Sequence, residues 1–212
     1  MTHPLIEAAA EGRLPTWARA GRTRQEHMNR VAELMVGWAE ALGLDREQVR
    51  RWKAVGHLHD VLREAPPGEL LPLVDPEHRA LPAPLLHGPA GAERLRQEGV
   101  DDASFLRAVA FHTIGHPELD RMGRALYCAD YLEPGRERRG HGRSGEDGAE
   151  GHPPSWRARR RERFPEEPDR VTLDVLRERV RTSLEEERPL PRETVHFWNS
   201  LVKEVAHGPP TS

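Results

Sequence analysis

Cysteine is almost absent from the sequence, with Cys128 the single one among 212 residues. One thiol excludes an intrachain disulfide framework and a zinc site built from several thiolates. Long apolar runs are also absent, because no stretch approaches the roughly 20 residues of a membrane-spanning helix. The first residues have neither a basic start nor an apolar core, so we expect no signal peptide. Together these absences predict a soluble, cytoplasmic protein without a membrane partner.

Apolar residues are also scarce, and neither sign of charge is in large excess. Hydrophobic residues make up 36% of the chain and charged residues 32%. This composition favours thin helices with solvated faces, or a flexible stretch. The 32 basic residues are balanced by 35 acidic ones, which argues against a nucleic-acid partner held by overall charge. The residue type in excess is histidine, with 12 copies, and it directs the search for a site.

Helical periodicity runs through most of the first two thirds of the chain. Val31, Leu34 and Trp38 recur at helical spacing until Gly43, and Asp45 is placed to cap the next helix. The proline-rich residues 65–84 predict short turns. Further helices are predicted over residues 84–98, 105–112 and 118–132, with two more after residue 165. No segment alternates as a β-strand does, so the predicted fold class is all-α.

The composition changes after Gly135. Residues 135–154 contain almost no apolar side chain and predict a flexible insert. The basic run RARRRER at residues 157–163 follows, and it is either a solvated helix face or a contact for phosphate or RNA. We therefore divide the chain into an N-terminal extension, a helical core, a flexible polar and basic insert, and C-terminal helices packed on the core: residues 1–22, 23–135, 136–165 and 166–212.

Several histidines and aspartates share the apolar faces of the predicted helices. His27 precedes the apolar positions of its helix by four, seven and eleven residues, so it points inward with them. His59, His87, His112 and Asp130 also continue the apolar stripes of their own segments. Asp60 directly follows His59 at an expected helix end, where a turn can aim both side chains at one point. A single such histidine is most often a hydrogen-bonded core residue, but the repetition on several helices predicts a shared site.

Burial of this set needs compensation. Each uncompensated buried charge costs several kcal/mol, and the usual net stability of a domain is only about 5–15 kcal/mol. Divalent cations compensate, because histidine nitrogen and aspartate oxygen are ligands for Fe, Mn, Zn or Co. Six ligands exceed the needs of one tetrahedral zinc and predict two metals that share a bridging aspartate. Two such metals can hold a hydroxide and neutralise charge on a phosphate under attack. The sequence has no glycine-rich phosphate loop and no supported serine-nucleophile motif.

This pattern of six residues resembles the HD-domain phosphohydrolase superfamily. The segments around them are similar to those of its YqeK-type branch, the symmetrical bis(5'-nucleosyl)-tetraphosphatases that hydrolyse Ap4A. The resemblance extends from Arg24 to Asn199 apart from the insert, and it is carried by residues 24–27 (RQEH), 85–89 (LLHGP), 111–115 (FHTIG), 129–136 (ADYLEPGR) and 191–195 (PRETV).

The resemblance implies an HD-domain helical bundle with a dimetal site in its core. The expected reaction is the symmetrical cleavage of Ap4A into two ADP by a dimetal-activated hydroxide, with Fe as the first candidate metal and Mn, Co or Zn as alternatives. By the same resemblance, one metal is held by His27, His59, Asp60 and Asp130, and the other by His87, His112 and the bridging Asp60. Of these, Asp60, His87 and His112 carry the catalytic role. The nucleotide and its phosphates are expected at Arg24, His87, His112, Thr113, Asp130 and Arg136.

The sequence departs from the family pattern at three places. Arg63 stands where HD proteins commonly have a lysine, Ile114 replaces a usual threonine, and the insert directly follows Arg136. These departures keep open a second hypothesis, hydrolysis of another nucleotide such as a dNTP, a nucleoside monophosphate or an alarmone. A third hypothesis is a nucleotide-binding scaffold without turnover.

Four further residues are expected at the edge of the site or away from it. Glu133 either orients a metal ligand as an acceptor or lies at an exposed helix end. Arg124 lies either near the pocket or at the surface. His57 is expected to face away from the cluster, and His116 to lie on a surface loop.

Overall fold

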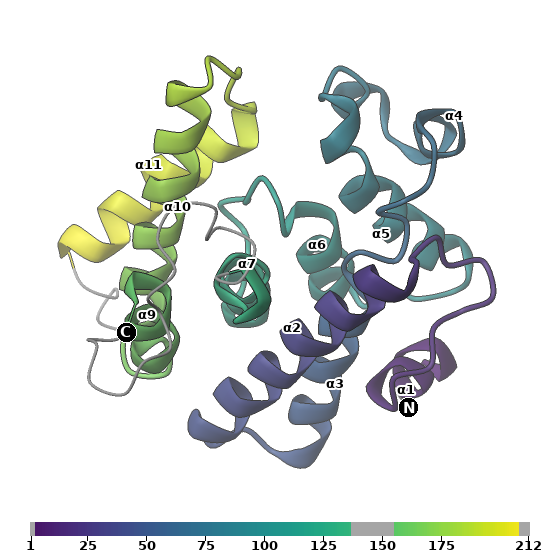
Figure 1. Cartoon of the computed structure of the whole chain (residues 1–212), viewed down its shortest axis with the longest axis horizontal. Coiled ribbons are helices and arrows are strands. Elements are labelled where there is room, and N and C mark those ends of the chain that lie inside the picture. The colour runs from purple at the N-terminus through teal and green to yellow at the C-terminus, as the bar shows by residue number, and fades with distance from the viewer. Residues whose placement is uncertain (1–2, 137–154, 208–212) are drawn as a thin grey trace.

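The computed structural model describes residues 3–136 and 155–207, and this part of the chain is entirely helices and turns (Figure 1). The predicted all-α class is confirmed. None of these helices has the length and hydropathy of a membrane span. The α-helices are α1 (Pro4–Ala10), α2 (Arg22–Ala41), α3 (Arg46–Leu58), α4 (Pro67–Leu70), α5 (His87–Gln97), α6 (Ala103–Phe111), α7 (Arg121–Leu132), α9 (Trp156–Arg163), α10 (Pro168–Glu185) and α11 (Arg192–His207). Short 3₁₀ turns lie at Leu71–Leu73, Pro76–His78 and Ala83–Leu85.

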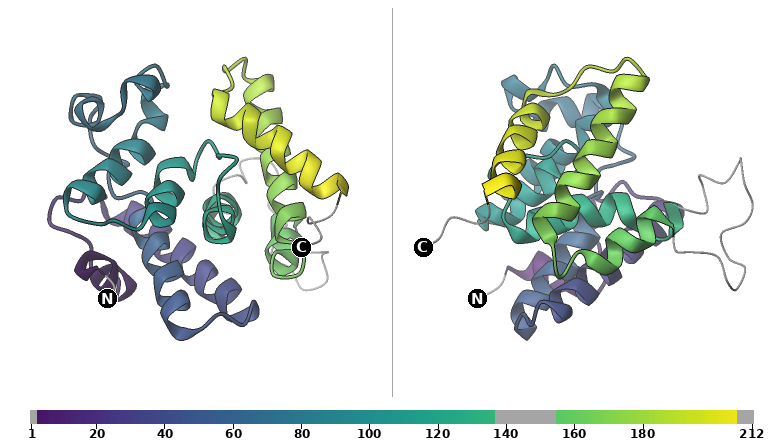
Figure 2. Two further views of the ribbon diagram at one scale, coloured as in Figure 1. Left: turned by 180° about the vertical axis from the view of Figure 1, so that it is seen from behind. Right: turned by 90° about the vertical axis from the view of Figure 1, so that its left-hand side faces the viewer.

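Helix α7 lies in the middle of the molecule. Helices α2, α3, α5 and α6 lie on one side of it, and α10 and α11 cross each other on the opposite side (Figures 1 and 2). Nine of its twelve residues are buried, because it is covered from both sides. A helix in this position can bring a side chain to the N-terminal helices while contacting the C-terminal pair.

Two helices begin later than the sequence predicts. The helix expected from Pro84 begins at His87, because a 3₁₀ turn occupies Ala83–Leu85. The helix expected from Glu118 begins at Arg121, because the side chain of Asp120 accepts a hydrogen bond from the Gly123 amide at 2.8 Å and caps it there.

Helices α2 and α3 form an antiparallel pair at unusually close range. Asp45 caps α3 as predicted and accepts from the Gln48 amide at 2.8 Å. Near the other end of α3, a methyl group on Gly56 would lie 2.6 Å from the Cα atom of Ala32 in α2. Only glycine therefore permits this approach, which sets the distance between the helices that carry His27 and His59.

Gly56→Ala is expected to lower the free energy of unfolding by about 1–3 kcal/mol, because the added methyl group forces the two backbones apart. Thermal or urea unfolding followed by circular dichroism measures the change. Gly37→Ala is the matched control, because Gly37 lies in α2 with no atom within 4 Å of the added carbon. It is expected to raise stability by about 0.5–1 kcal/mol. Equal destabilisation by both variants would refute the close-contact explanation.

The C-terminal part of the predicted flexible insert, residues 155–165, is largely helical. Trp156–Arg163 form α9, which is anchored on α2: the Phe164 ring stacks on Trp38 at 4.0 Å, and the Trp38 indole donates to the Arg161 carbonyl at 2.9 Å. The other part of the predicted insert, residues 137–154, lies outside the described residues. Residues 156–163 of the predicted insert therefore form a docked helix, which a buried aromatic contact holds against α2.

The basic run of α9 is engaged with the rest of the chain. Arg160 donates to Asp174 at 2.7 Å, and Arg163 to Glu167 at 2.5 Å. Arg160 is only 22% exposed, so the run is partly packed against the chain and is not simply a solvated helix face.

The predicted N-terminal extension contains a docked helix. Helix α1 packs against α3, and the Nδ1 atom of His57 donates to the Ala9 carbonyl at 2.7 Å. His57 therefore faces α1 and not the histidine cluster, as its position two residues before His59 indicates.

Candidate metal centre

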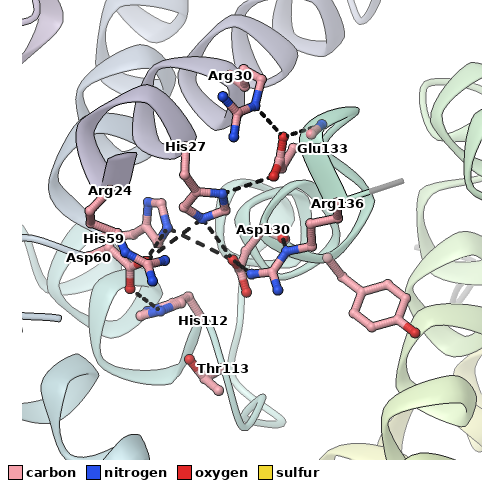
Figure 3. Close-up of polar contacts among 12 residues, drawn as sticks. Arg24, His27, Arg30, His59, Asp60, His112, Thr113, Asp130, Glu133 and Arg136 are labelled. Carbon is pink, nitrogen blue, oxygen red and sulfur yellow. Dashed lines mark hydrogen bonds and ion pairs between the residues drawn. The ribbon is translucent and has the colours of Figure 1, made fainter. Parts of the chain in front are cut away.

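The six predicted ligands meet in the core, although they come from five helices or helix ends. Figure 3 labels five of them: His27, His59, Asp60, His112 and Asp130. None is more than 4% exposed. His27 lies in the second turn of α2, and His59 and Asp60 lie at the C-terminal end of α3. His87 begins α5, His112 ends α6, and Asp130 lies in the last turn of α7. The close approach of α2 and α3 brings His27 of α2 close to His59 and Asp60 at the end of α3.

Asp60 lies between two groups of histidines. Its Oδ2 atom is 3.7 Å from His27 Nε2 and 3.5 Å from His59 Nε2. Its Oδ1 atom is 3.0 Å from His87 Nε2 and 3.4 Å from His112 Nε2. The two triads His27–His59–Asp60 and Asp60–His87–His112 each have the spacing to hold a metal ion. One carboxylate thus serves both groups, with one oxygen on each.

Asp130 adds a second carboxylate to the first group only. Its Oδ1 atom is 3.2 Å from His27 Nε2 and 4.0 Å from His59 Nε2. The first group is therefore two histidines and two carboxylates, and the second is two histidines and the shared Asp60. The structure brings together the same two sets that the family resemblance implies.

Each of the four imidazoles is oriented by its Nδ1 atom. Three of them donate from Nδ1 to the carbonyl oxygen three residues earlier, and the fourth donates to a carboxylate. The pairs are His59 to Gly56 at 2.8 Å, His87 to Pro84 at 2.9 Å, His112 to Val109 at 2.7 Å and His27 to Glu133 at 3.1 Å. With the proton on Nδ1, the lone pair of each Nε2 atom faces the cluster, which is the arrangement of metal-binding histidines.

The donor set fits a divalent cation. The Nε2 atoms of His27 and His59 are fully buried and have no hydrogen-bond partner. A buried polar atom without a partner costs about 1–3 kcal/mol, so two of them in one place need an explanation. Neutral imidazole nitrogens with ionised aspartates are ligands for Fe, Mn, Co and Zn, and a cation would satisfy both atoms.

Both aspartates are held in the ionised form that binds cations. Burial by itself would raise the pKa of Asp60, but the neighbouring imidazoles of His59 and His112 lower it well below its usual range. Burial would also raise the pKa of Asp130, but the charges of Arg136 and Arg179 and the neighbouring His27 imidazole lower it well below its usual range. Burial lowers the pKa of His87 in spite of Asp60, which favours its neutral, metal-binding form.

Glu133 orients the cluster rather than lying at an exposed helix end. It is 1% exposed, and it accepts hydrogen bonds from His27 Nδ1, from Arg30 Nε at 2.6 Å and from the Gly135 amide at 2.6 Å. Against the effect of burial, these donors lower its pKa to about 2. Of the two interpretations of Glu133, the structure therefore supports the orienting one.

The predicted phosphate-binding arginines lie on the metal-ligand carboxylates. Arg24 donates to Asp60 Oδ2 at 2.7 Å. Arg136 donates from Nη2 to Asp130 Oδ1 at 2.5 Å and from Nε to the Asp130 carbonyl at 2.6 Å. Figure 3 shows both guanidinium groups beside the histidines.

A cavity of about 630 Å³ adjoins the cluster. Thr113 and Arg136 line it, as do Tyr131, Arg157 and Arg179. Its walls come from the Ala83–Leu85 turn, α7, and the end of α10 with the segment that follows it. With Arg188, four arginines line the cavity, and their guanidinium groups give it a positive field suited to an anionic ligand.

Arg124, whose position relative to the site the sequence left open, and His116, which is expected on a surface loop, both lie away from this cluster. Arg124 donates to Asp169 at 2.6 Å and to Glu204 at 2.7 Å, so it joins α7 to α10 and α11. His116 stacks on Phe111 at 4.5 Å. Neither is among the residues that line the cavity beside the cluster.

Arg179 donates to Asp130 Oδ2 at 2.9 Å, and it is not among the site residues predicted from the sequence. A signal was present, because Arg179 follows the buried Val171 and Val175 at intervals of four residues. An arginine on an apolar helix face requires a buried partner, as the inward-facing histidines do.

Comparisons with known proteins identify the family to which this chain is similar. Residues 24–135 match the model of the family described as HD domain. The chain is similar to symmetrical bis(5'-nucleosyl)-tetraphosphatases of Halalkalibacterium halodurans (43% identity over 54 residues, 25% of this chain and 29% of the relative), Staphylococcus aureus (30% over 119 residues, 53% and 60%) and Bacillus subtilis (32% over 117 residues, 51% and 58%). The matches thus span less than two thirds of the length of these relatives.

A solved structure has the same fold. It is a crystal structure described as a predicted HD superfamily hydrolase involved in NAD metabolism, from Clostridium acetobutylicum. The two chains superpose with a TM-score of 0.69 at 23% identity, over 87% of this chain and 91% of that one. The predicted helical HD-domain fold is therefore confirmed.

Proposed function

The chain belongs to the HD domain family, and we propose that it is a metal-dependent hydrolase that cleaves dinucleoside tetraphosphates symmetrically, splitting Ap4A into two ADP. The observation that carries this proposal is the pair of histidine groups joined by the Asp60 carboxylate. The relatives named as symmetrical tetraphosphatases support the choice of substrate.

Six residues of this chain would hold the two cations. His27, His59 and Asp130 would hold one, His87 and His112 the other, and Asp60 both. When bound, two such ions supply an activated water and neutralise charge on the phosphate under attack. Iron is the first candidate, and the nitrogen and oxygen donors also suit Mn, Co or Zn.

The chain's own cationic residues would bind the polyphosphate. Arg136 reaches from the wall of the cavity to the carboxylate of Asp130, so it lies between the cavity and the cluster. Thr113 directly follows His112 and lines the same cavity. A planar guanidinium binds two phosphate oxygens at once, and a hydroxyl donates one further bond. Arg24, on the opposite carboxylate, is placed to contact phosphate oxygens on the far side of the cluster.

The cavity volume is compatible with part of a nucleotide. At about 630 Å³ it lies within the roughly 300–1,000 Å³ of small-molecule sites. Phosphates at its positive end and a nucleoside toward its apolar wall, which includes Leu85 and Leu190, would place the phosphate chain across the two metals.

The test is product analysis. The purified protein is incubated with Ap4A and Fe(II) under anaerobic conditions, or with Mn(II), and the products are resolved by ion exchange. ADP is expected as the single nucleotide product. Formation of ATP with AMP would refute symmetrical cleavage. No turnover with any metal would refute the proposed hydrolase activity. A dNTP, a nucleoside monophosphate and an alarmone form the comparison panel, and a higher kcat/KM for any of them would overturn the substrate assignment.

A further inference from the structure

Arg179 connects the C-terminal helices with the metal centre. It comes from α10, outside residues 24–135 that match the family model. Its side chain is 18% exposed, and its guanidinium contacts residues on both sides of the cluster. Its Nε atom is buried without a hydrogen-bond partner. Because burying a guanidinium is costly, the bonds of its two Nη atoms indicate a specific role.

Arg179 and the histidines approach different oxygens of the Asp130 carboxylate. Its Nη2 atom donates to Asp130 Oδ2 at 2.9 Å, whereas the two histidines approach Asp130 Oδ1, at 3.2 Å from His27 and 4.0 Å from His59. Arg179 therefore holds the oxygen that faces away from the histidines. It leaves the other oxygen directed at them.

The remaining arginines on these carboxylates differ in this respect. Arg136 Nη2 binds Asp130 Oδ1, the oxygen that faces the histidines. Arg24 binds Asp60 Oδ2, which also faces His27. Both bind an oxygen on the side of the histidines, where a cation would bind, whereas Arg179 binds the other oxygen of Asp130.

The same guanidinium also contacts the second half of the centre. Its Nη1 atom donates to the carbonyl oxygen of Thr113 at 3.2 Å, and Thr113 directly follows His112. A third bond runs from Nη2 to the Tyr127 carbonyl at 3.3 Å. One side chain thus contacts a carboxylate of the first group and the backbone next to a histidine of the second.

Aromatic rings fix the plane of this guanidinium. Its central carbon lies 4.6 Å from the centre of the Tyr127 ring and 5.1 Å from that of the Tyr131 ring. Tyr127 is fully buried and cannot move aside. A planar, forked group is needed to stack on rings and to donate in two directions, and lysine cannot replace it in both roles.

We propose that Arg179 is a positioning residue of the metal centre, which orients the Asp130 carboxylate and the His112–Thr113 turn so that the C-terminal helices contribute to metal affinity. The proposal rests on the metal centre of the proposed function but not on the identity of the nucleotide. A residue that orients a ligand in this way typically changes metal affinity 10–100-fold.

The test compares two buried arginines at the junction of α7 and α10. Arg179→Met removes the contact with Asp130. Arg124→Met removes the ion pairs with Asp169 and Glu204, which join the same helices without touching the cluster. Co(II) and Mn(II) are titrated into each full-length protein after chelation, and the visible spectrum of the Co(II) form reports the ligand geometry. Unfolding temperatures are recorded in parallel.

Arg179→Met is expected to weaken metal binding by about 100-fold and to change the Co(II) spectrum, whereas Arg179→Lys weakens it by about tenfold. Arg124→Met is expected to lower the unfolding temperature with wild-type metal affinity. Wild-type affinity and spectrum in both Arg179 variants would overturn the proposal, as would equal weakening by Arg124→Met. If Arg179→Met does not fold, Arg179→Lys decides by the same criteria. Failure of the wild-type protein to bind either metal would instead refute the metal centre itself.

Discussion

Asp60→Asn is expected to remove both metal ions and to lower the rate of Ap4A hydrolysis by at least about 10²–10³-fold, the loss that follows removal of a single charged or polar group from a preorganised site. Asp60 is the carboxylate that reaches both histidine groups, with Oδ2 toward His27 and His59 and Oδ1 toward His87 and His112. Asparagine has the same shape but lacks the negative charge, and its nitrogen cannot act as a ligand. A change at this one position therefore acts on both groups.

Metal content by elemental analysis and steady-state kinetics measure the effect. Asp45→Asn is the matched control, because it makes the same chemical change at the other end of α3, where asparagine caps a helix as well as aspartate does. The control is expected to keep the wild-type metal content and rate. An Asp60→Asn protein that retains about two metals per chain would refute the bridging role, and one that retains full activity would refute catalysis at this cluster.

The buried, inward-facing positions of the six candidate ligands were predictable from the sequence, because they depend on local geometry. Helical spacing places His27 on the face that also carries Val31 and Trp38, and both of these are buried. The cap at Asp45 depends on a contact three residues away. Such features are set within a few turns of helix, so periodicity and capping rules are sufficient to find them.

Contacts between distant segments were not predictable in the same way. Glu133 had two interpretations, and its bond to Arg30, 103 residues away in the chain, distinguishes them. Phe164 lies beside a basic run, and only its stacking on Trp38 shows that α9 is docked. The partner of Arg179 is 49 residues away, so its position on an apolar face indicates that a partner exists but not which one.

The arginines around the cluster divide into two kinds by the oxygen that each one binds. Arg24 and Arg136 bind oxygens that face the histidines, whereas Arg179 binds one that does not. In the proposed function, Arg24 and Arg136 are placed to release their carboxylate partner and to bind a phosphate of the substrate instead. The third keeps its carboxylate throughout, which is why we assign it to positioning and not to substrate binding.

Metal binding is expected to raise the thermal stability of the protein substantially. The folded chain buries two ionised carboxylates and two Nε2 atoms without partners in one place, and the unfolded chain does not assemble these six ligands. A ligand that binds only the folded state at 100 times its Kd stabilises that state by about 2.7 kcal/mol. For a chain of this size, each kcal/mol corresponds to about 2–4 °C, so the unfolding temperature should rise by roughly 5–11 °C.

Scanning calorimetry of the chelator-treated protein, with and without Mn(II) or Co(II), measures this shift. A second addition of chelator should reverse it, because the effect is one of binding equilibrium. Asp60→Asn provides the control, since it retains the rest of the protein's acidic surface but lacks the shared ligand. A shift of the same size in Asp60→Asn would place the stabilising cation elsewhere on the protein. A shift confined to the wild-type chain would show that the buried histidines and aspartates, which burial alone would make costly, stabilise the fold through the cations they bind.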